Sequence, residues 1–349
     1  MNFFSTSPTI IITMGPSIAD ELTFRNLLQF PISHVRFNMS HGTKDEHLAR
    51  LHMVRKVSKE CNKDLILFAD LCGPKIRVQT IEHGELSLSH GDVFRIAPSS
   101  VIGNKERISL SFHELYTCVT KGTNITFNDG KIEVVVIEID HKDIVCSVIK
   151  GGILVAEKGV NIPTITTPLP ALTEKDKEDV LFAIENTFDA LGLSFVSSEK
   201  DIHTLQLFLE EHGTTLPIIS KIETRKALTN IEQIIRASDS IMVARGDLGI
   251  EIPVLEIPIV QKELCYLGKK MNTPVIVATE ILKTMTENTY PTRAEVTDAM
   301  NALIDGASYL MLSDETTVGL HPTEAVELLS GAIDEFTTHH TKYSLFEKK

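Results

Sequence analysis

Two side chains of opposite charge, Lys221 and Glu223, are separated by one residue at the end of the apolar run LPIISKIE (216–223). Residues two apart in a strand point to the same side, so this ammonium and carboxylate would lie together. The next apolar run, SIMVARGD (240–247), ends in Asp247. If the two strands are neighbours, Glu223 and Asp247 can share one hard cation such as magnesium, with water and substrate oxygens completing its shell. A purely structural salt bridge between Lys221 and Glu223 is the competing interpretation.

A second cation, Arg36, stands near the end of the run HVRFNMS (34–40). Together, Arg36 and Lys221 beside a metal would form a positive pocket, which favours an anionic, phosphorylated substrate. The segment GDLG (246–249) precedes a short helical pattern and offers backbone N–H groups for a carboxylate or phosphate. The sequence contains no G-x-x-x-x-G-K-[ST] motif, which excludes a P-loop nucleotide site.

Short apolar runs must position these residues, and helical patterns lie between most of the runs. Near-continuous apolar strands alternating with helices are typical of a covered parallel sheet. The spacing is regular except after the third run, where about 90 additional residues are inserted into an otherwise barrel-sized chain. We therefore predict an α/β fold, a (β/α)8 TIM barrel, although an open sheet of nine strands would also fit. The runs are TIIITMG (9–15), HVRFNMS (34–40), LILFAD (65–70), ALGLSFV (190–196), LPIISKIE (216–223), SIMVARGD (240–247), PVIVATE (274–280) and YLMLSDE (309–315).

The insertion has a different pattern, with short alternating runs separated by Gly, Asn and Asp turns. This pattern predicts a small all-β domain, because alternation with frequent turns is typical of antiparallel strands. We expect the β domain at residues 77–163 and the barrel at 1–76 and 164–349. A domain held over the carboxyl face of a barrel can act as a lid.

The composition excludes several classes of function. The chain has 349 residues, 42% hydrophobic and 23% charged, with 47 Asp+Glu against 34 Lys+Arg and a net charge of −13. Such an acidic protein is not expected to bind nucleic acid. Five scattered cysteines without a C-x-x-C pair argue against disulfides and zinc, and fit a reducing cytoplasm. No signal peptide and no run of about 20 apolar residues is present, so no membrane association is expected.

The motifs resemble those of the pyruvate kinase family over almost the whole chain, in the family's order. This resemblance implies a (β/α)8 barrel with a β lid inserted after the third strand, which agrees with the spacing above. The segments that carry the resemblance are HVRFNMSHG (34–42), ADLCGPKIR (69–77), KGVNIP (158–163), ISKIE (219–223), IMVARGDLGIEIP (241–253), PVIVATE (274–280), PTRAEVTDAMNALIDGA (291–307) and MLSDET (311–316).

The resemblance also implies the activity, which is transfer of the phosphoryl group of phosphoenolpyruvate to ADP, giving pyruvate and ATP in glycolysis. It implies that Glu223 and Asp247 bind magnesium or manganese. Lys221 would neutralise charge on the phosphoryl group during transfer and Arg36 would hold the phosphate, since positioning and electrostatics dominate such reactions.

The remaining site residues carried over from the family fall into three groups. The backbone of Ala244, Arg245, Gly246 and Asp247 would hold the substrate carboxylate. Thr279, with Ser313 and Glu315, would take part in protonation of the enolate methylene carbon. Asn38, His41, Arg77 and Lys158 would contact the nucleotide.

Three loops depart from the family pattern. Many members bind potassium through groups matching Asn38, Ser40, Asp70 and a threonine, but position 71 is Leu71 here. Position 75, where potassium-dependent members carry Glu, is Lys75, so we expect its ammonium to replace potassium. Glu280 and Asp314 stand where the family usually has Gln and Gly. Two additional carboxylates would raise the pKa values of neighbouring acids if they lie close to them.

Family members usually continue into a C-terminal regulatory domain, which we expect this chain to lack, while a homo-oligomer could form through barrel contacts. Two alternatives to an active pyruvate kinase stay open. One is a metal-dependent lyase or aldolase of 2-oxo acids, which would use the same metal pair. The other is a catalytically weak regulatory relative. Retention of the nucleotide-side residues His41 and Lys158 favours the kinase.

Overall fold

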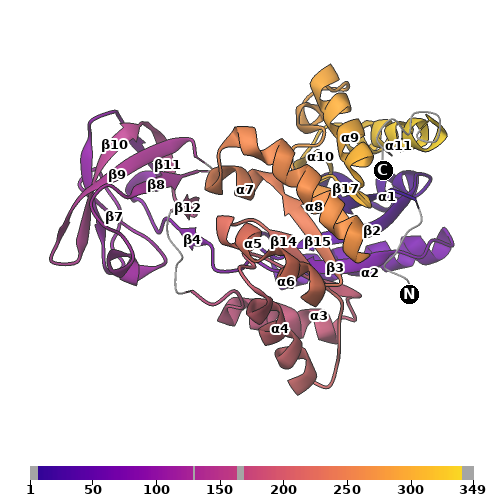
Figure 1. Ribbon diagram of the computed structural model, residues 1–349, viewed down its shortest axis with the longest axis horizontal. Helices are drawn as coiled ribbons and strands as arrows, with labels where there is room; N and C mark the ends of the chain where they lie inside the picture. Colours follow the sequence, from indigo (N-terminus) through magenta and orange to yellow (C-terminus); the bar gives the residue numbers. More distant parts are fainter. Residues whose placement is uncertain (1–6, 129, 163–168, 340–349) are drawn as a thin grey trace.

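Eight parallel strands form a closed barrel in the computed structural model, which describes residues 7–128, 130–162 and 169–339 (Figure 1). The strands are β1 (Thr9–Thr13), β2 (Ile32–Asn38), β3 (Ile66–Asp70), β13 (Ala190–Leu193), β14 (Ile218–Ile222), β15 (Ser240–Ala244), β16 (Val275–Ala278) and β17 (Tyr309–Met311). Their order is β1-β17-β16-β15-β14-β13-β3-β2, and β1 pairs with both β17 and β2. The predicted (β/α)8 barrel is therefore confirmed, and the closed order excludes an open sheet.

The barrel interior is filled by apolar side chains, among them Phe68, Ile219 and Tyr309. His34 joins this layer, with its ring 4.7 Å from that of Tyr309. Alternate residues of a strand share a face, so the residues two positions after His34, Phe68 and Ile219 also point inward. Those residues are Arg36, Asp70 and Lys221. The strand period thus places a charged layer directly above the apolar layer, at the carboxyl end of the barrel.

Helices surround the barrel, and the larger apolar core lies between them and the outer face of the strands (Figure 1). Thr173 caps α3, accepting a hydrogen bond from the backbone of Asp176. No helix of the described ranges is long and apolar enough to cross a membrane. The helices are α1 (Glu21–Leu27), α2 (Lys44–Glu60), α3 (Glu174–Glu185), α4 (Glu199–Glu211), α5 (Arg225–Thr229), α6 (Ile231–Ala237), α7 (Arg245–Glu251), α8 (Ile257–Met271), α9 (Arg293–Asp305), α10 (Asp314–Thr317) and α11 (Pro322–His339).

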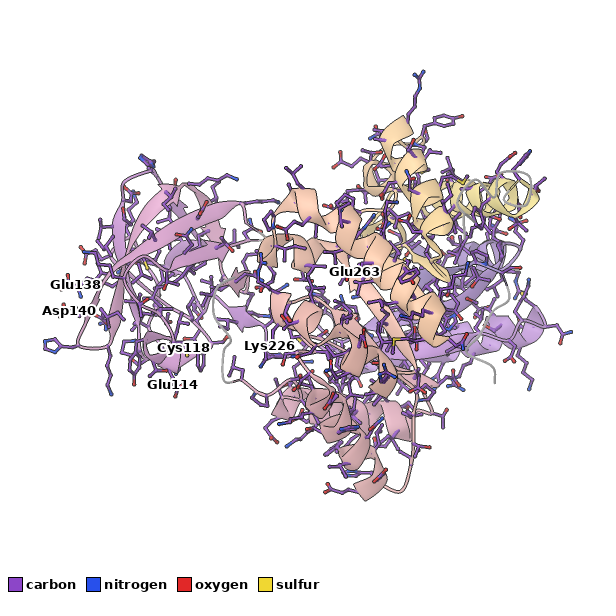
Figure 2. All side chains as sticks on the ribbon, viewed as in Figure 1. Glu114, Cys118, Glu138, Asp140, Lys226 and Glu263 are labelled. Atoms are coloured by element: carbon purple, nitrogen blue, oxygen red, sulfur yellow. The ribbon has the colours of Figure 1, made fainter. Side chains whose placement is uncertain are left out.

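The chain between β3 and α3 forms a separate β module with its own apolar core, at one end of the molecule (Figure 1). Figure 2 shows Glu138 and Asp140 at its outer end and Lys226 on the side that faces it from the barrel. One sheet has the order β4-β12-β8-β9-β10-β6-β7, and β11 pairs with β5. The strands are β4 (Ile76–Arg77), β5 (Glu85–Leu88), β6 (Val93–Ala97), β7 (Arg107–Ser109), β8 (Asn124–Phe127), β9 (Ile132–Asp140), β10 (Asp143–Lys150), β11 (Gly152–Val155) and β12 (Gly159–Asn161).

The two connections between the β module and the barrel lie side by side. Strand β4 leaves the barrel and pairs antiparallel with β12, which leads back, with Arg77 opposite Gly159 and Ile76 opposite Val160. The predicted boundary between residues 163 and 164 lies outside the described residues.

Candidate active site

Asp70 is the centre of a buried charge network at the carboxyl end of the barrel. Its side chain is 1% exposed, and its Oδ2 atom accepts a hydrogen bond from Arg36 Nε at 2.6 Å. Its Oδ1 atom, which makes no hydrogen bond among the described residues, forms an ion pair with Lys221 Nζ at 3.3 Å. One buried carboxylate thus holds two cations next to each other. Like charges repel, so their proximity requires this shared anion.

Lys221 has two further partners, Glu223 Oε1 at 2.9 Å and Ser194 Oγ at 2.8 Å. Burial acts to lower the pKa of Lys221, but the carboxylates of Asp70 and Glu223 outweigh it and raise that pKa above its usual value. Burial raises the pKa of Glu223, although Lys221 opposes this. The Lys221 ammonium therefore remains charged in a site with little access to water, where its field on a bound anion is strong.

Asp247, in the first turn of α7, lies 3.1 Å through its Oδ1 atom from Lys75 Nζ. Burial acts to raise the pKa of Asp247, but Lys75 and Lys221 outweigh it and lower that pKa. The charge of Asp247 in turn contributes to the raised pKa of Glu223, so the two carboxylates lie close enough to interact. They are also the pair that the sequence assigns to a divalent metal.

The donor set of Glu223 and Asp247 fits a hard cation. Magnesium is commonly bound by one or two carboxylates, with water and substrate phosphates filling its other positions. In the described part of the chain, no three His, Cys, Asp or Glu side chains gather into a metal site.

A cavity of about 550 Å³ opens between this network and the β module. It is lined by residues from the barrel and, from the β module, by Arg77, Ala156, Glu157, Lys158 and Gly159. Ten residues predicted from the sequence line it: Arg36, Asn38, Ser40, His41, Lys75, Arg77, Lys158, Lys221, Glu223 and Asp247. The fold therefore brings together the predicted metal, phosphate and nucleotide residues from segments far apart in the sequence.

The electrostatics of this cavity favour an anion. Burial lowers the pKa of His41, and the cations Arg77, Arg36, Lys75 and Lys158 lower it further. Burial and four nearby cations therefore all disfavour the protonated form of the His41 imidazole. A ligand with several negative charges, such as a phosphorylated compound, would balance these cations.

Thr279, Ser313 and Glu315 do not line this cavity and form a second group beside it. Thr279 and Glu280 have positive φ angles of 68° and 55°, which are unfavourable for residues with a side chain, most of all for β-branched Thr279. The Thr279 Oγ1 atom accepts a hydrogen bond from Gly246 N at 2.8 Å, which connects this group to α7. Strained backbone of this kind is often found at functional sites.

The side chain of Arg245 points away from the cavity and binds the backbone of Thr279. Its Nη2 atom donates to the carbonyl oxygens of Thr279 at 2.7 Å and Glu280 at 3.2 Å, and its Nη1 atom donates to Asp298 at 2.7 Å. A direct contact between substrate and this residue would therefore involve its backbone. The side chain instead fixes the unusual turn that follows β16.

Glu315 is buried at 1% exposure, and its carboxylate accepts hydrogen bonds from Leu282 N at 3.1 Å and Ser313 N at 2.8 Å. The Ser313 Oγ atom is buried and has no hydrogen-bond partner among the described residues. A buried hydroxyl without a partner is costly, so it indicates a place for a water molecule or a ligand.

Sequence reasoning missed several residues of the site. Ser194 bridges Lys221 and the carbonyl oxygen of Leu71, which it reaches at 2.7 Å. Gly192 faces Asp70, and Thr13 Oγ1 accepts a 3.3 Å hydrogen bond from Arg36. The run ALGLSFV (190–196) carries no charge that would mark Gly192 or Ser194. Their position at the carboxyl end of a barrel strand was the only available signal.

Comparisons with known proteins agree with the geometry. A family model described as "Pyruvate kinase, barrel domain" matches residues 5–326. The pyruvate kinase of Thermotoga maritima is 39% identical over 94% of this chain and 71% of its own length. That of Thermococcus litoralis is 40% identical, over 92% of this chain and 68% of its own length. A crystal structure of a pyruvate kinase from Cryptosporidium parvum superposes with a TM-score of 0.90 and 34% identity, covering 95% of this chain and 69% of that one.

Fold, cavity and sequence similarity thus lead to the same family. The matched region includes both the charge network around Asp70 and the strained turn at Thr279. The chain belongs to the pyruvate kinase family.

Proposed function

We propose that this chain transfers the phosphoryl group of phosphoenolpyruvate to ADP, giving pyruvate and ATP. The observation that carries the proposal is Lys221, a buried lysine that two carboxylates keep charged next to Arg36 at the wall of a cationic cavity. In the reaction, the bond between phosphorus and the enol oxygen breaks and a bond to a β-phosphate oxygen of ADP forms. Lys221 and Arg36 would stabilise the negative charge on the phosphoryl oxygens during this step.

Glu223 and Asp247 would hold a magnesium or manganese ion, which when bound neutralises charge on the phosphoryl group and the enolate. Lys75 and Lys221 neutralise these carboxylates in the structure. Asn38, His41, Arg77 and Lys158 would contact the nucleotide. The β module would act as the lid, because Lys158 and its neighbours form the wall of the cavity opposite the barrel.

After the phosphoryl group has left, the enolate takes a proton at its methylene carbon and its oxygen becomes the ketone oxygen of pyruvate. Thr279, Ser313 and Glu315 would hold the proton-donating water. The Ser313 hydroxyl has no hydrogen-bond partner within the described ranges, which supports this assignment, because it can still bond to such a water. The backbone of Ala244, Arg245, Gly246 and Asp247 would hold the substrate carboxylate. Gly246 N is hydrogen-bonded to Thr279 Oγ1, so the carboxylate end and the proton-transfer end adjoin each other.

Potassium is not required in this proposal. Asp70, one of the residues that match the potassium site, already carries Arg36 and Lys221 on its two oxygens. Lys75 lies at the cavity wall, where its ammonium supplies a fixed positive charge. A monovalent cation would therefore add little to the charge balance.

The lyase or aldolase alternative is less well supported than the kinase. A lyase has no need for the cation group of Arg77, Lys75 and Lys158 around His41. A catalytically weak relative is also less well supported, because the charged residues predicted for phosphoryl transfer and metal binding, Arg36, Lys221, Glu223 and Asp247, line one cavity.

A homo-oligomer through the barrel fits the exposed apolar side chains on one outer face. Val254, Leu255 and Ile259, on the short helix η4 (Val254–Glu256) and on α8, are all exposed, Leu255 at 86%. Light scattering should give a mass above one chain, and Leu255→Asp should reduce it.

All five cysteines are free, which supports the reducing cytoplasm as the location.

A coupled assay for pyruvate tests the function, with phosphoenolpyruvate in the presence and absence of ADP, magnesium and potassium. We expect product only with ADP and magnesium, whereas product without ADP would support the lyase. Lys221→Ala should lower kcat by about a thousandfold or more, since a preorganised charge on the phosphoryl group is lost. Lys226→Ala, on the nearby α5, is the control and should retain kcat. An active Lys221→Ala enzyme would contradict the assignment.

A further inference from the structure

Lys283, the first residue of the short helix η5 (Lys283–Thr286), forms an ion pair with Asp314, the first residue of α10. Lys283 is next in sequence to a residue that hydrogen-bonds to Glu315, and Asp314 is next in sequence to Glu315 itself. Leu282, which precedes Lys283, donates its backbone N–H to Glu315 Oε1 at 3.1 Å, and Glu315 itself follows Asp314. The ion pair therefore joins the two segments between which the buried Glu315 carboxylate is held.

Lys283 is also the counter-charge for a group of carboxylates. Burial acts to lower the pKa of Lys283, but Asp314 outweighs it, with further contributions from Glu315 and Glu280, so the pKa lies above its usual value. The ammonium thus stays charged among three acids from two loops. Without it, Asp314 and Glu280 would place unbalanced negative charge beside the proton-transfer group.

The two segments do not depend on this pair alone for their fold. Leu320 N donates to the carbonyl oxygen of Thr286 at 2.9 Å, which ties the chain after α10 to the end of η5. Glu295 accepts hydrogen bonds from Thr284 N and from Thr284 Oγ1. Both members of the pair are about half exposed, at 50% and 52%, and such pairs contribute little to stability. Its removal should therefore leave the fold intact.

We propose that Lys283 is a positioning residue for proton transfer to the enolate. It fixes Glu315 through the Asp314 bridge and balances the charges of Asp314 and Glu280, so that a water between Ser313 and the substrate can give its proton to the methylene carbon. In that step an O–H bond of the water breaks and a C–H bond forms, the carbon–carbon double bond becomes single, and the enolate oxygen becomes the ketone oxygen. The hydroxide that remains takes up a proton from solvent. The inference rests on the proposed function and assigns a role within its second half.

The test separates the proton step from phosphoryl transfer. The first assay measures pyruvate formation from phosphoenolpyruvate and ADP. The second follows, by proton NMR in D2O with magnesium and inorganic phosphate, the exchange of the methyl protons of pyruvate for deuterium. We expect Lys283→Met to slow the exchange by about tenfold, which is part of the rate acceleration that general acid–base catalysis usually gives. The KM for ADP should change less than about twofold.

Three further variants make the result specific. Lys283→Arg keeps the charge and should retain most of the exchange rate. Lys283→Met combined with Asp314→Asn removes the unbalanced carboxylate and should recover part of the loss, which a double-mutant cycle quantifies. Lys56→Met breaks a matched ion pair on α1 and α2, Lys56–Glu21, with side chains 54% and 48% exposed, and should leave both assays unchanged.

Two results would overturn the inference. If the wild-type chain is active but Lys283→Met exchanges methyl protons at the wild-type rate, Lys283 has no role in the proton step. If Lys283→Met lowers exchange, phosphoryl transfer and thermal stability together, and the second substitution recovers nothing, the pair is only structural. Absence of pyruvate formation by the wild-type chain would instead overturn the proposed function itself.

Discussion

Gly192 on β13 faces Asp70 on β3 so closely that a Cβ atom at Gly192 would lie 2.8 Å from Asp70 Oδ1. The absence of a side chain at position 192 therefore leaves room for the carboxylate that holds Arg36 and Lys221. A non-bonded carbon and oxygen cannot approach so closely, so a methyl group would displace Asp70.

The first prediction follows from this contact. Gly192→Ala should lower kcat by about tenfold or more, because small displacements of catalytic groups have large effects on rate. Gly331→Ala is the control, since among the described residues no atom outside the neighbouring backbone of α11 lies within 4 Å of its Cβ position. Steady-state kinetics of both variants would check this, and an unchanged kcat for Gly192→Ala would show that the position of Asp70 is not critical.

The second prediction concerns Lys75 and monovalent ions. With magnesium present, the wild-type chain should turn over near its maximal rate without potassium, because the Lys75 ammonium stands 3.1 Å from Asp247 at the cavity wall. Lys75→Met should reduce the potassium-free rate by about tenfold or more, since a charge next to the transferred group is removed. Rates in potassium chloride and in tetramethylammonium chloride would be compared. Strong potassium activation of the wild type contradicts the assignment.

The third prediction concerns pH and stability. Burial lowers the pKa of His34, inside the barrel, from 6.5 to about 4. Because the folded state has the lower pKa, the unfolded state binds the proton first as pH falls. The free energy of unfolding should therefore be highest above pH 6.5. It should decrease by about 3 kcal/mol as the pH falls from 6.5 through 4.

Urea unfolding followed by circular dichroism at pH 7, 5.5 and 4.5 would measure this dependence. The variant His34→Leu, which cannot take up a proton, should show a smaller decrease than the wild type across the same range. Equal decreases for the two proteins would mean that His34 does not control the acid sensitivity of the barrel.

The fourth prediction concerns the support of the strained turn. Arg245→Lys should lower kcat by about tenfold, because a lysine cannot bind the carbonyl oxygens of Thr279 and Glu280 and the carboxylate of Asp298 at once. Thr279 would then relax from its positive φ angle. A crystal structure of the variant together with its kinetics would test this, and full activity with a relaxed turn would contradict it.

The sequence was sufficient to predict the barrel and the principal charged residues. Seven of the eight strands lie within a predicted apolar run, because a strand covered on both faces must be apolar along its length, and β2 begins at Ile32, two residues before its run. Arg36, Lys221, Glu223 and Asp247 interrupt or end such runs, and a charge at that position is informative in a barrel. The position of a charged side chain along its strand thus predicted that it faces the mouth of the barrel.

The contacts between strands could not be predicted in the same way. The fit of Gly192 against Asp70 and the bond from Ser194 to Lys221 depend on which strands are neighbours and in what register. Sequence alone also gave no direction for the Arg245 side chain. The additional carboxylates Glu280 and Asp314 were expected to disturb their neighbours. The sequence did not indicate that Lys283 is their counter-charge, because this pairing depends on the contact between η5 and α10 in the fold.

The pairing of β4 with β12 has a consequence for the history of the molecule. Since Arg77 lies opposite Gly159, the outgoing and returning chains are as close as the two arms of a hairpin, which two residues suffice to join. Everything between these residues could be lost or exchanged as a cassette without changing the distance that the barrel must span. A domain of different size or sequence could occupy the same point of attachment in a descendant protein, while the eight-stranded barrel kept its closure.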